Sequence, residues 1–421
     1  MRKLYYLWAS IYFAILGFLV RQATRNMAVK HSPSQFGLLL RTYLKRPEWL
    51  YYPGVGLDPI KRFTFRSFSD STPEDRRLCE RLIASYKLAT RDESSKELVS
   101  GLWEGNIQKH YTSLTETLCA GDPAALATTL ASMFQQPFLY GIASSDLGKD
   151  SGYAVFIRMK ILEELLSLAE SLGVVRTETP EQGVLGHAFA DGLEELVKKI
   201  EKQLDISLNF PDVGGAYGLE IGGRLITPES SEHIYVASRI SEAIARHIGV
   251  TGQNAARIVE IGAGFGGTAY WLNLLSKRSI KNYTIIDLPL MNVCQGYFLA
   301  KAFGAGSVRL FGETQSDSII FTIIPPHAKK TALAGGFEVL INENSMPEMS
   351  VSVVNEYLSW AKNELRGVFY SYNQESFSPV SGIPQTLVPR VVSDVGGFKR
   401  LSRNYSWVRR GYVEEVYSVT R

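Results

Sequence analysis

The chain has 421 residues, of which 45% are hydrophobic and 21% charged, as in globular proteins and unlike disordered, collagenous or polytopic membrane chains. This length favours two or three domains over one. The formal charge of +3 is too small to indicate nucleic-acid binding. Cys79, Cys119 and Cys294 lie far apart and form no CxxC pair. We therefore expect neither a disulfide framework nor a cysteine-based zinc site, and the cytoplasm is the expected compartment.

An uncharged hydrophobic stretch covers residues 4–20, with aromatic residues near its start and basic residues on both sides. Its length is at the lower limit for a helix that crosses a bilayer, so a buried helix and a membrane anchor both fit. Lysine and arginine outnumber acidic residues over 21–66, which favours association with an anionic membrane surface. We expect a hydrophobic segment at 1–25, with membrane association through 4–20, and a basic linker at 26–70.

Residues 71–212 have helical periodicity and predict a helical accessory domain. Thr72 and Asp122, each followed by a proline, are helix start signals. A third apolar run, from Tyr153 to Leu172, ends at Gly173, which is typical of a helix C-cap. These helices carry no recognisable catalytic cluster, so we expect them to serve as a scaffold or a lid.

A second domain is expected over residues 213–421. Alternating residues on both sides of Gly222 and Gly223 predict a small β-hairpin. Thr227 and the proline after it then predict the cap of a helix that runs to about His247.

A glycine-rich turn, GAGFGG at 262–267, follows the short apolar strand 257–261 and precedes a helical run to Leu275. In this context the glycines let backbone N–H groups and a helix N-terminus approach a ligand closely. The next strand, 283–286, ends in Asp287, where a carboxylate can accept both ribose hydroxyls of a nucleoside. Turn and carboxylate together predict a cofactor that contains adenosine.

The identity of that cofactor is open at this point, because Gly262, Gly264 and Gly267 also match the dinucleotide pattern GxGxxG. Glu260 would repel a pyrophosphate but suits the amino-acid half of S-adenosylmethionine. The chain after the motif suffices for one wound sheet, and its end predicts an antiparallel hairpin about Gly411, which methyltransferase sheets commonly have. We expect S-adenosylmethionine. The alternatives are an NAD-dependent oxidoreductase and a non-catalytic adenosyl-binding protein.

A polar loop at 342–349 follows the apolar strand 337–341. The carboxyl ends of the strands of a doubly wound sheet line the ligand crevice, so this loop is expected to face the site. Ser345 and Glu348 have the spacing of a capping box for the next helix, and both interpretations can hold together. The residues expected to face the site are Asn342, Glu343 and Asn344.

Five blocks of the sequence resemble the sugar O-methyltransferase family, a branch of the class I S-adenosylmethionine-dependent methyltransferases. They are EIGAGFGG at 260–267, IIDLP at 285–289, INENSMPEM at 341–349, the upstream block at 217–240 and the terminal WVRRGYVEEVY. The resemblance covers about Ser71 to the end. It implies a Rossmann-like class I methyltransferase sheet with a C-terminal antiparallel hairpin, preceded by helices. It also implies methylation of a sugar hydroxyl on a surface glycan, a glycolipid or its precursor, as in polysaccharide biosynthesis. Glu343 departs from the family pattern, in which this position is small or polar and uncharged.

Methyl transfer is an in-line displacement, in which the attacking oxygen lies opposite the sulfonium leaving group. Because a sugar hydroxyl is a weak nucleophile, we expect a general base to accept its proton. No aspartate pair or His/Asp cluster has metal-ligand spacing, so no metal is expected. The candidate bases are His327, His233, Glu343 and Glu348. The candidate cofactor-binding residues are Glu260, Gly262, Ala263, Gly264, Gly266, Asp287, Leu288, Asn342, Asn344 and Tyr217, and Arg239 is a further candidate contact to cofactor or acceptor. A lipid or small aromatic acceptor is the remaining alternative to a sugar or glycan.

Overall fold

The computed structural model describes residues 63–66, 72–91, 102–139, 152–179, 181, 190–248, 255–276, 279–316, 318–376 and 384–420. The hydrophobic segment at 4–20 and nearly all of the basic linker lie outside these residues, so their membrane association stays a prediction. Within the described part of the chain, no helix is long and apolar enough to cross a membrane.

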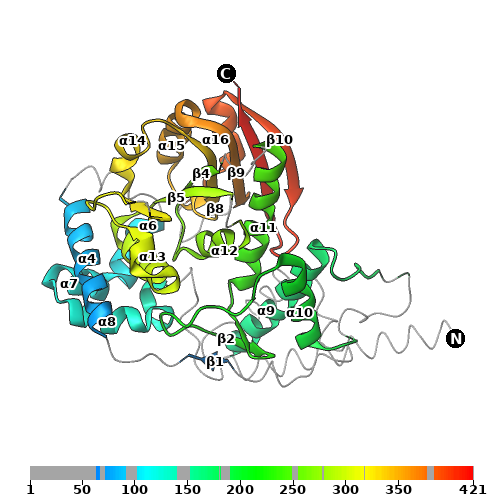
Figure 1. Ribbon diagram of the computed structural model, residues 1–421. Coiled ribbons are helices and arrows are strands. Elements are labelled where there is room, and N and C mark those ends of the chain that lie inside the picture. The colour runs from blue at the N-terminus through cyan, green and yellow to red at the C-terminus, as the bar shows by residue number, and fades with distance from the viewer. Residues whose placement is uncertain are drawn as a thin grey trace.

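Within the described residues, eight strands form one sheet in the order β10-β11-β9-β8-β4-β5-β7-β6 (Figure 1). The pairs from β9 to β6 are parallel, whereas β11 is antiparallel to both of its neighbours, β9 and β10. The last strand of the chain is therefore inserted before the end strand of a doubly wound sheet. This is the Rossmann-like methyltransferase sheet, and the predicted fold class and C-terminal hairpin are confirmed. The strands are β4 (Ala256–Ile261), β5 (Ile280–Ile286), β6 (Val308–Arg309), β7 (Phe321–Ile324), β8 (Phe337–Glu343), β9 (Leu365–Gln374), β10 (Phe398–Tyr405) and β11 (Tyr412–Val419).

Helices cover both faces of this sheet because alternate residues of its strands point to opposite sides. In β4, Ile258 belongs to one hydrophobic cluster and Val259 to the other. The first cluster includes α11, α12 and α13, and the second includes α15 and α16. The bounds are α11 (Ser230–His247), α12 (Gly267–Leu275), α13 (Pro289–Phe303), α14 (Lys329–Ala332), α15 (Val351–Glu364) and α16 (Val388–Val395).

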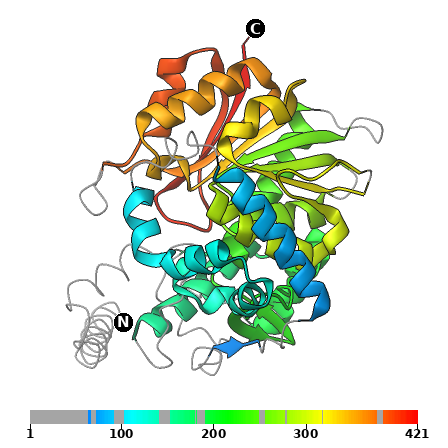
Figure 2. The ribbon, with the colours of Figure 1, turned by 90° about the vertical axis from the view of Figure 1, so that its left-hand side faces the viewer.

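The N-terminal helices lie on the α11–α13 side of the sheet, opposite α15 and α16 (Figure 2). Thr72 caps the first of them through a capping box with Asp75, and Asp122 caps α8, so both predicted helix starts are confirmed. Gly173, just past α9, has a φ of 67°, as expected for a C-terminal glycine. The bounds are α4 (Pro73–Ala89), α6 (Leu102–His110), α7 (Thr112–Ala120), α8 (Pro123–Ala131), α9 (Gly152–Ser171) and α10 (Leu193–Leu204).

A small antiparallel sheet joins the two regions. It consists of β1 (Thr64–Phe65) and the predicted hairpin, β2 (Tyr217–Ile221) and β3 (Arg224–Ile226). The expected cap at Thr227 is wrong, because α11 begins at Ser230 and the Thr227 hydroxyl is hydrogen-bonded to the Ser230 hydroxyl at 2.8 Å. The predicted end of that helix at His247 is confirmed.

Candidate functional site

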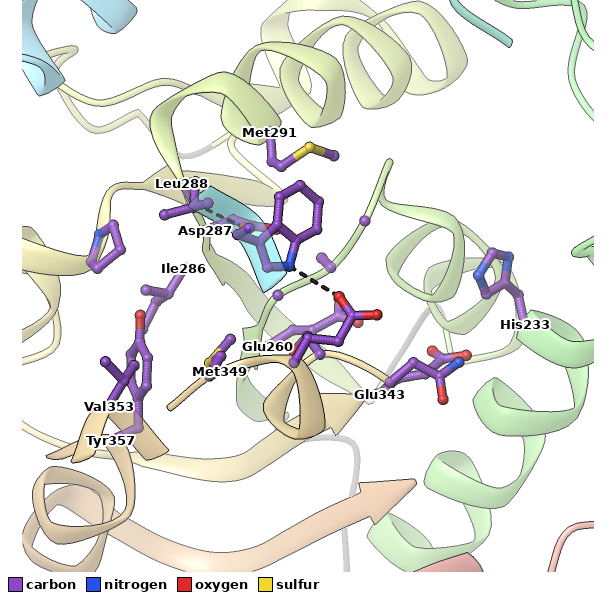
Figure 3. A pocket seen from close by; sticks show the side chains of 18 of the residues that line it. His233, Glu260, Ile286, Asp287, Leu288, Met291, Glu343, Met349, Val353 and Tyr357 are labelled. Carbon is purple, nitrogen blue, oxygen red and sulfur yellow. Dashed lines mark hydrogen bonds between the residues drawn. The ribbon is translucent and has the colours of Figure 1, made fainter. Parts of the chain in front are cut away.

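A pocket lies where the parallel strands β4, β5 and β8 end (Figure 3). The turn after β4 lines its floor, Asp287 follows β5, and Glu343 ends β8. Glu260 lies between two groups of side chains in Figure 3. Ile286, Val353 and Tyr357 are on one side of it, and Glu343 and His233 are on the other. The pocket is therefore extended across the strand ends, with β4 at its centre.

Gly262 lets the polar loop after β8 pack directly against the glycine turn. Its φ is 73°, and a Cβ built at this position would lie 2.1 Å from the Ser345 Oγ. The Ser345 hydroxyl donates to the Ile261 carbonyl at 2.9 Å in the space that the missing side chain leaves. Gly262 is thus required both by its backbone conformation and by this close approach.

Gly267 makes room for a histidine. A Cβ at this position would lie 2.3 Å from the Nδ1 atom of His233, which projects from α11. The His233 ring lines the pocket and makes an edge contact with Phe265, with ring centroids 5.3 Å apart. Burial lowers the pKa of His233, and the charges of Glu229 and Glu232 offset this only in part. The imidazole is therefore neutral at pH 7.

Asp287 retains acceptor capacity for a ligand. Its two carboxylate oxygens accept from the Leu288 backbone N–H at 2.8 Å and from the Gln295 side-chain amide at 2.6 Å. Each carboxylate oxygen has two lone pairs, so further hydroxyl donors can be accepted. Burial raises the pKa of Asp287 to about 7.

Glu260 is buried beneath the glycine turn and accepts a hydrogen bond from the Tyr283 hydroxyl at 2.8 Å. Burial raises its pKa to about 8, although the Tyr283 bond acts in the opposite direction. In the empty pocket Glu260 is mostly protonated at pH 7. The sequence predicts that Glu260 repels a pyrophosphate. A mostly protonated Glu260 repels it less than a permanently charged carboxylate would.

An apolar group of side chains lies beside Asp287 and suits a planar aromatic base. They come from the end of β5, the start of α13, the segment after β7, and α15 with the segment before it, and several are labelled in Figure 3. A ribose bound to Asp287 would place its base against this group. Its members are Ile286, Leu288, Met291, Pro326, Met349, Val353 and Tyr357.

A polar cluster occupies the opposite end of the pocket. The Nη1 atom of Arg409, from the β10–β11 connection, donates to both carboxylate oxygens of Glu232 on α11, at 3.0 and 3.1 Å. Asn344 donates to the same carboxylate at 3.3 Å. Burial would raise the pKa of Glu232, but the Arg409 charge holds it below its usual range. Burial and the nearby Glu232 raise the pKa of Glu343 well above normal, and Thr268 donates to its carboxylate.

The helical region reaches the pocket through Trp103 of α6. Its indole N–H donates to Glu348 at 3.0 Å, and burial raises the pKa of Glu348 to about 7. The capping box predicted for Ser345 and Glu348 is therefore wrong, because Glu348 accepts from Trp103. The Ser345 hydroxyl donates to Ile261 instead, and Ser350 is the residue that caps α15.

Most of the candidate residues line the pocket, but four do not. His327, in the short 3-10 helix η7 (Pro326–Ala328), makes an edge contact with Phe311. Asn342 is buried and donates to the Ile261 carbonyl at 2.9 Å. The other two are Gly266, which precedes α12, and Tyr217, whose ring stacks on Phe65.

Arg239 also lies outside the pocket, in an ion pair with Glu414. The candidates that do line the pocket are His233, Glu343, Glu348, Glu260, Gly262, Ala263, Gly264, Asp287, Leu288 and Asn344.

Sequence reasoning missed Trp103, Glu229, Glu232, Arg409 and Tyr412, all of which line the pocket. The upstream block at 217–240 contains Glu229 and Glu232, and the terminal block WVRRGYVEEVY contains Arg409 and Tyr412. The family-like blocks could therefore have indicated these four residues. Trp103 had no such signal. Among the described residues, no group of three or more His, Cys, Asp or Glu side chains could hold a metal ion.

No family model matches the chain, and no curated protein matches it in sequence. Solved structures with a similar fold include magnesium protoporphyrin IX methyltransferase from Synechocystis PCC 6803, at 12% identity with a TM-score of 0.31 over 45% of this chain and 80% of that one. The CcbJ methyltransferase of Streptomyces caelestis gives 11% identity and a TM-score of 0.31 over 45% of this chain and 95% of that one. These likenesses are low, and the fold assignment rests on the strand order described above. That order defines a protein with the Rossmann-like methyltransferase fold.

Proposed function

We propose that the protein is an S-adenosylmethionine-dependent O-methyltransferase that acts on a sugar hydroxyl. The observation that carries the proposal is the combination of a glycine turn, a ribose-binding carboxylate and an apolar base site at the strand ends of a methyltransferase sheet. The sugar acceptor is supported by the resemblance of the upstream block and of the 341–349 loop to sugar O-methyltransferases.

The pocket has a chemical match for each part of the cofactor. Asp287 would accept the ribose hydroxyls, and the apolar group beside it would hold the adenine ring. The turn at 262–264 and Glu260 would face the amino-acid half. When bound, the cofactor supplies an electrophilic methyl group on a positively charged sulfur. The carboxyl groups around that position stabilise the positive charge.

His233 is the general base that we favour. A base must be unprotonated at the working pH and must reach the attacking hydroxyl. His233 is neutral because burial lowers its pKa, whereas burial raises the pKa of Glu343 well above its usual range and that of Glu348 to about 7, so neither is fully ionised in the empty pocket. His327 lies outside the pocket. His233 would accept the hydroxyl proton while the oxygen attacks the methyl group in line, at about 3–3.5 Å.

An NAD-dependent oxidoreductase is not favoured. The antiparallel β11, inserted between β9 and β10, departs from the all-parallel continuation of a dinucleotide-binding sheet.

The test is a turnover assay that needs no knowledge of the acceptor. The full chain is incubated with S-adenosylmethionine and a panel of oligosaccharides, glycolipids, simple lipids and phenols, and S-adenosylhomocysteine is measured by mass spectrometry. We expect product only with carbohydrate acceptors and about a 100-fold or larger loss of turnover in His233→Asn. Product with phenols alone would contradict the sugar acceptor. Undiminished turnover in His233→Asn would contradict His233 as the general base.

A further inference from the structure

We propose that the β8 side of the pocket is an acceptor subsite for an uncharged sugar and that it excludes sugars carrying a carboxylate or a phosphate. The inference rests on the proposed function. In the sheet order, β5 lies on one side of β4 and β8 on the other. Ile286, Val353 and Tyr357, from the group matched to the adenine ring, lie on one side of Glu260 and Glu343 lies on the other (Figure 3). The polar cluster around Glu343 therefore remains for the acceptor.

Three polar atoms in this cluster lack a partner within the described chain. They are the Glu343 Oε1, the Asn344 Oδ1 and the Arg409 Nε atoms, each buried and without a hydrogen bond. The Glu343 side chain as a whole is only 8% exposed, and all three residues line the pocket. Buried polar atoms are nearly always paired, so this set indicates a ligand that completes their hydrogen bonds.

The unpaired atoms include both acceptors and a donor, and burial raises the pKa of Glu343 well above its usual range, which favours its neutral form. A sugar hydroxyl donates one hydrogen bond and accepts two, so neighbouring hydroxyls can satisfy such a mixed set. A carboxylate or phosphate only accepts. Where such a group takes the place of a hydroxyl beside Asn344, it leaves the Oδ1 atom unpaired.

The charged side chains around the pocket also favour an uncharged sugar. Among the described residues that line the pocket, Arg409 is the sole lysine or arginine, and its guanidinium already pairs with Glu232. It also lies over the Tyr412 ring, with Cζ 4.0 Å from the centroid, which fixes its orientation. The nearby Lys160 pairs with Glu164 at 3.1 Å and Glu229 at 3.8 Å. An anionic sugar would therefore face the ionised Glu232 without an unpaired cation to bind it.

The experiment compares matched glycosides on the full chain saturated with S-adenosylhomocysteine. The probes are the methyl glycosides of glucose, galactose, mannose and rhamnose, with methyl glucuronide and methyl galacturonide as anionic counterparts, and binding is followed by saturation-transfer NMR. We expect at least one neutral glycoside to bind and the uronates to bind about tenfold or more weakly. Glu232→Gln removes the carboxylate that neutralises Arg409, so it should admit the uronates.

Glu242→Gln is the matched control, because Glu242 is on the same helix, pairs with Arg239 and lies outside the pocket. It should retain the wild-type preference. Equal binding of uronates and neutral glycosides to the wild type would overturn the inference. So would the absence of binding by every neutral glycoside while S-adenosylhomocysteine is bound, or continued exclusion of uronates by Glu232→Gln with S-adenosylhomocysteine still bound. If S-adenosylhomocysteine itself does not bind, the proposed function fails first, and the inference fails with it.

Discussion

The position of His233 in the pocket depends on a residue without a side chain. The His233 ring lies against the Gly267 backbone and the Phe265 ring, so it is held between a glycine and an aromatic residue. In the GxGxxG pattern, Gly267 is the third glycine, which ordinarily lets the helix pack closely against the strand. Here it does not line the pocket, and its close contact is with the proposed base.

Gly267→Ala should therefore reduce catalysis more than cofactor binding. The new Cβ would lie 2.3 Å from the His233 Nδ1 atom, and a ring has no flexible end that could move aside. We expect turnover to fall about tenfold or more and S-adenosylmethionine affinity to change by less than about threefold. Gly105→Ala in α6 is the control, since a Cβ at Gly105 meets no atom within 4 Å. A loss confined to cofactor affinity would assign Gly267 to the cofactor site instead.

The two buried carboxyl groups at the centre of the pocket predict a pH dependence of cofactor binding. In the empty pocket the pKa of Asp287 is about 7 and that of Glu260 about 8. A bound cation favours the ionised form of each, so binding releases protons and strengthens as the pH rises through 7 and 8. Calorimetry between about pH 6 and pH 9 should show the dissociation constant of S-adenosylmethionine falling by about tenfold. NAD would give the opposite trend, and Glu260→Gln should flatten the curve for S-adenosylmethionine.

At the scale of elements, the pocket is built from segments far apart in the sequence. Helix α6 contributes Trp103, α11 contributes Glu232, and the β10–β11 connection contributes Arg409. The bond from Trp103 to Glu348 links α6 directly to the loop after β8. Opening of α6 should therefore be coupled to that loop.

Trp103→Phe retains an aromatic ring and removes this hydrogen bond. We expect the amides of α6 to exchange with deuterium about tenfold faster, because a hydrogen bond to a carboxylate contributes about 1.5–3 kcal/mol. The amides of α12 should be unaffected. Trp360→Phe is the matched control, since the Trp360 indole N–H is buried in α15 and has no hydrogen-bond partner among the residues that the structure describes. Unchanged exchange in α6 would show that the bond does not restrain the helix.

The strands and the glycine turn were predictable because their signals are local. Apolar runs, the GAGFGG turn and Asp287 after the second strand predicted residues that meet at the strand ends, and Gly262, Gly264 and Asp287 do line one pocket there. The pairing of Glu232 with Arg409 was not predictable, because it depends on β11 being inserted between β9 and the edge strand β10.

The capping-box prediction failed for a similar reason. The spacing of Ser345 and Glu348 satisfies the local rule, but both side chains find partners that the local sequence does not contain. The Ile261 carbonyl accepts from Ser345, and Glu348 accepts from Trp103. Tyr217 likewise packs against β1, whose pairing with β2 the sequence did not indicate.

At the scale of the whole molecule, the helical region and the sheet share one core. Buried residues of α4, α8 and α9 belong to the same hydrophobic cluster as those of α11, α12 and α13. Two ion pairs reinforce this contact: Asp75 pairs with Lys301 at 2.6 Å, and Arg81 with Glu313 at 2.7 Å. The expected boundary near residue 212 would then separate two regions that fold together.

Leu82→Ala in α4 should accordingly destabilise the whole described fold. Leu82 is 1% exposed and packs against Gly296 of α13. We expect a loss of about 2–5 kcal/mol in the free energy of unfolding and a single transition by both far-UV and near-UV circular dichroism. Glu80→Ala, on the exposed face of the same helix, should have little effect. Two separate transitions, with only the first shifted, would mean that the regions unfold independently.

The most direct test of the central claim is calorimetric binding of S-adenosylmethionine to the full chain, with NAD titrated in parallel. We predict micromolar affinity for the methyl donor, about −8 kcal/mol, and its loss in Asp287→Ala. Asp191→Ala is the matched control, because Asp191 is an exposed partner of Lys199 outside the pocket and should leave binding unchanged. Binding of NAD alone, or S-adenosylmethionine binding that survives the loss of Asp287, would contradict the assignment of this pocket.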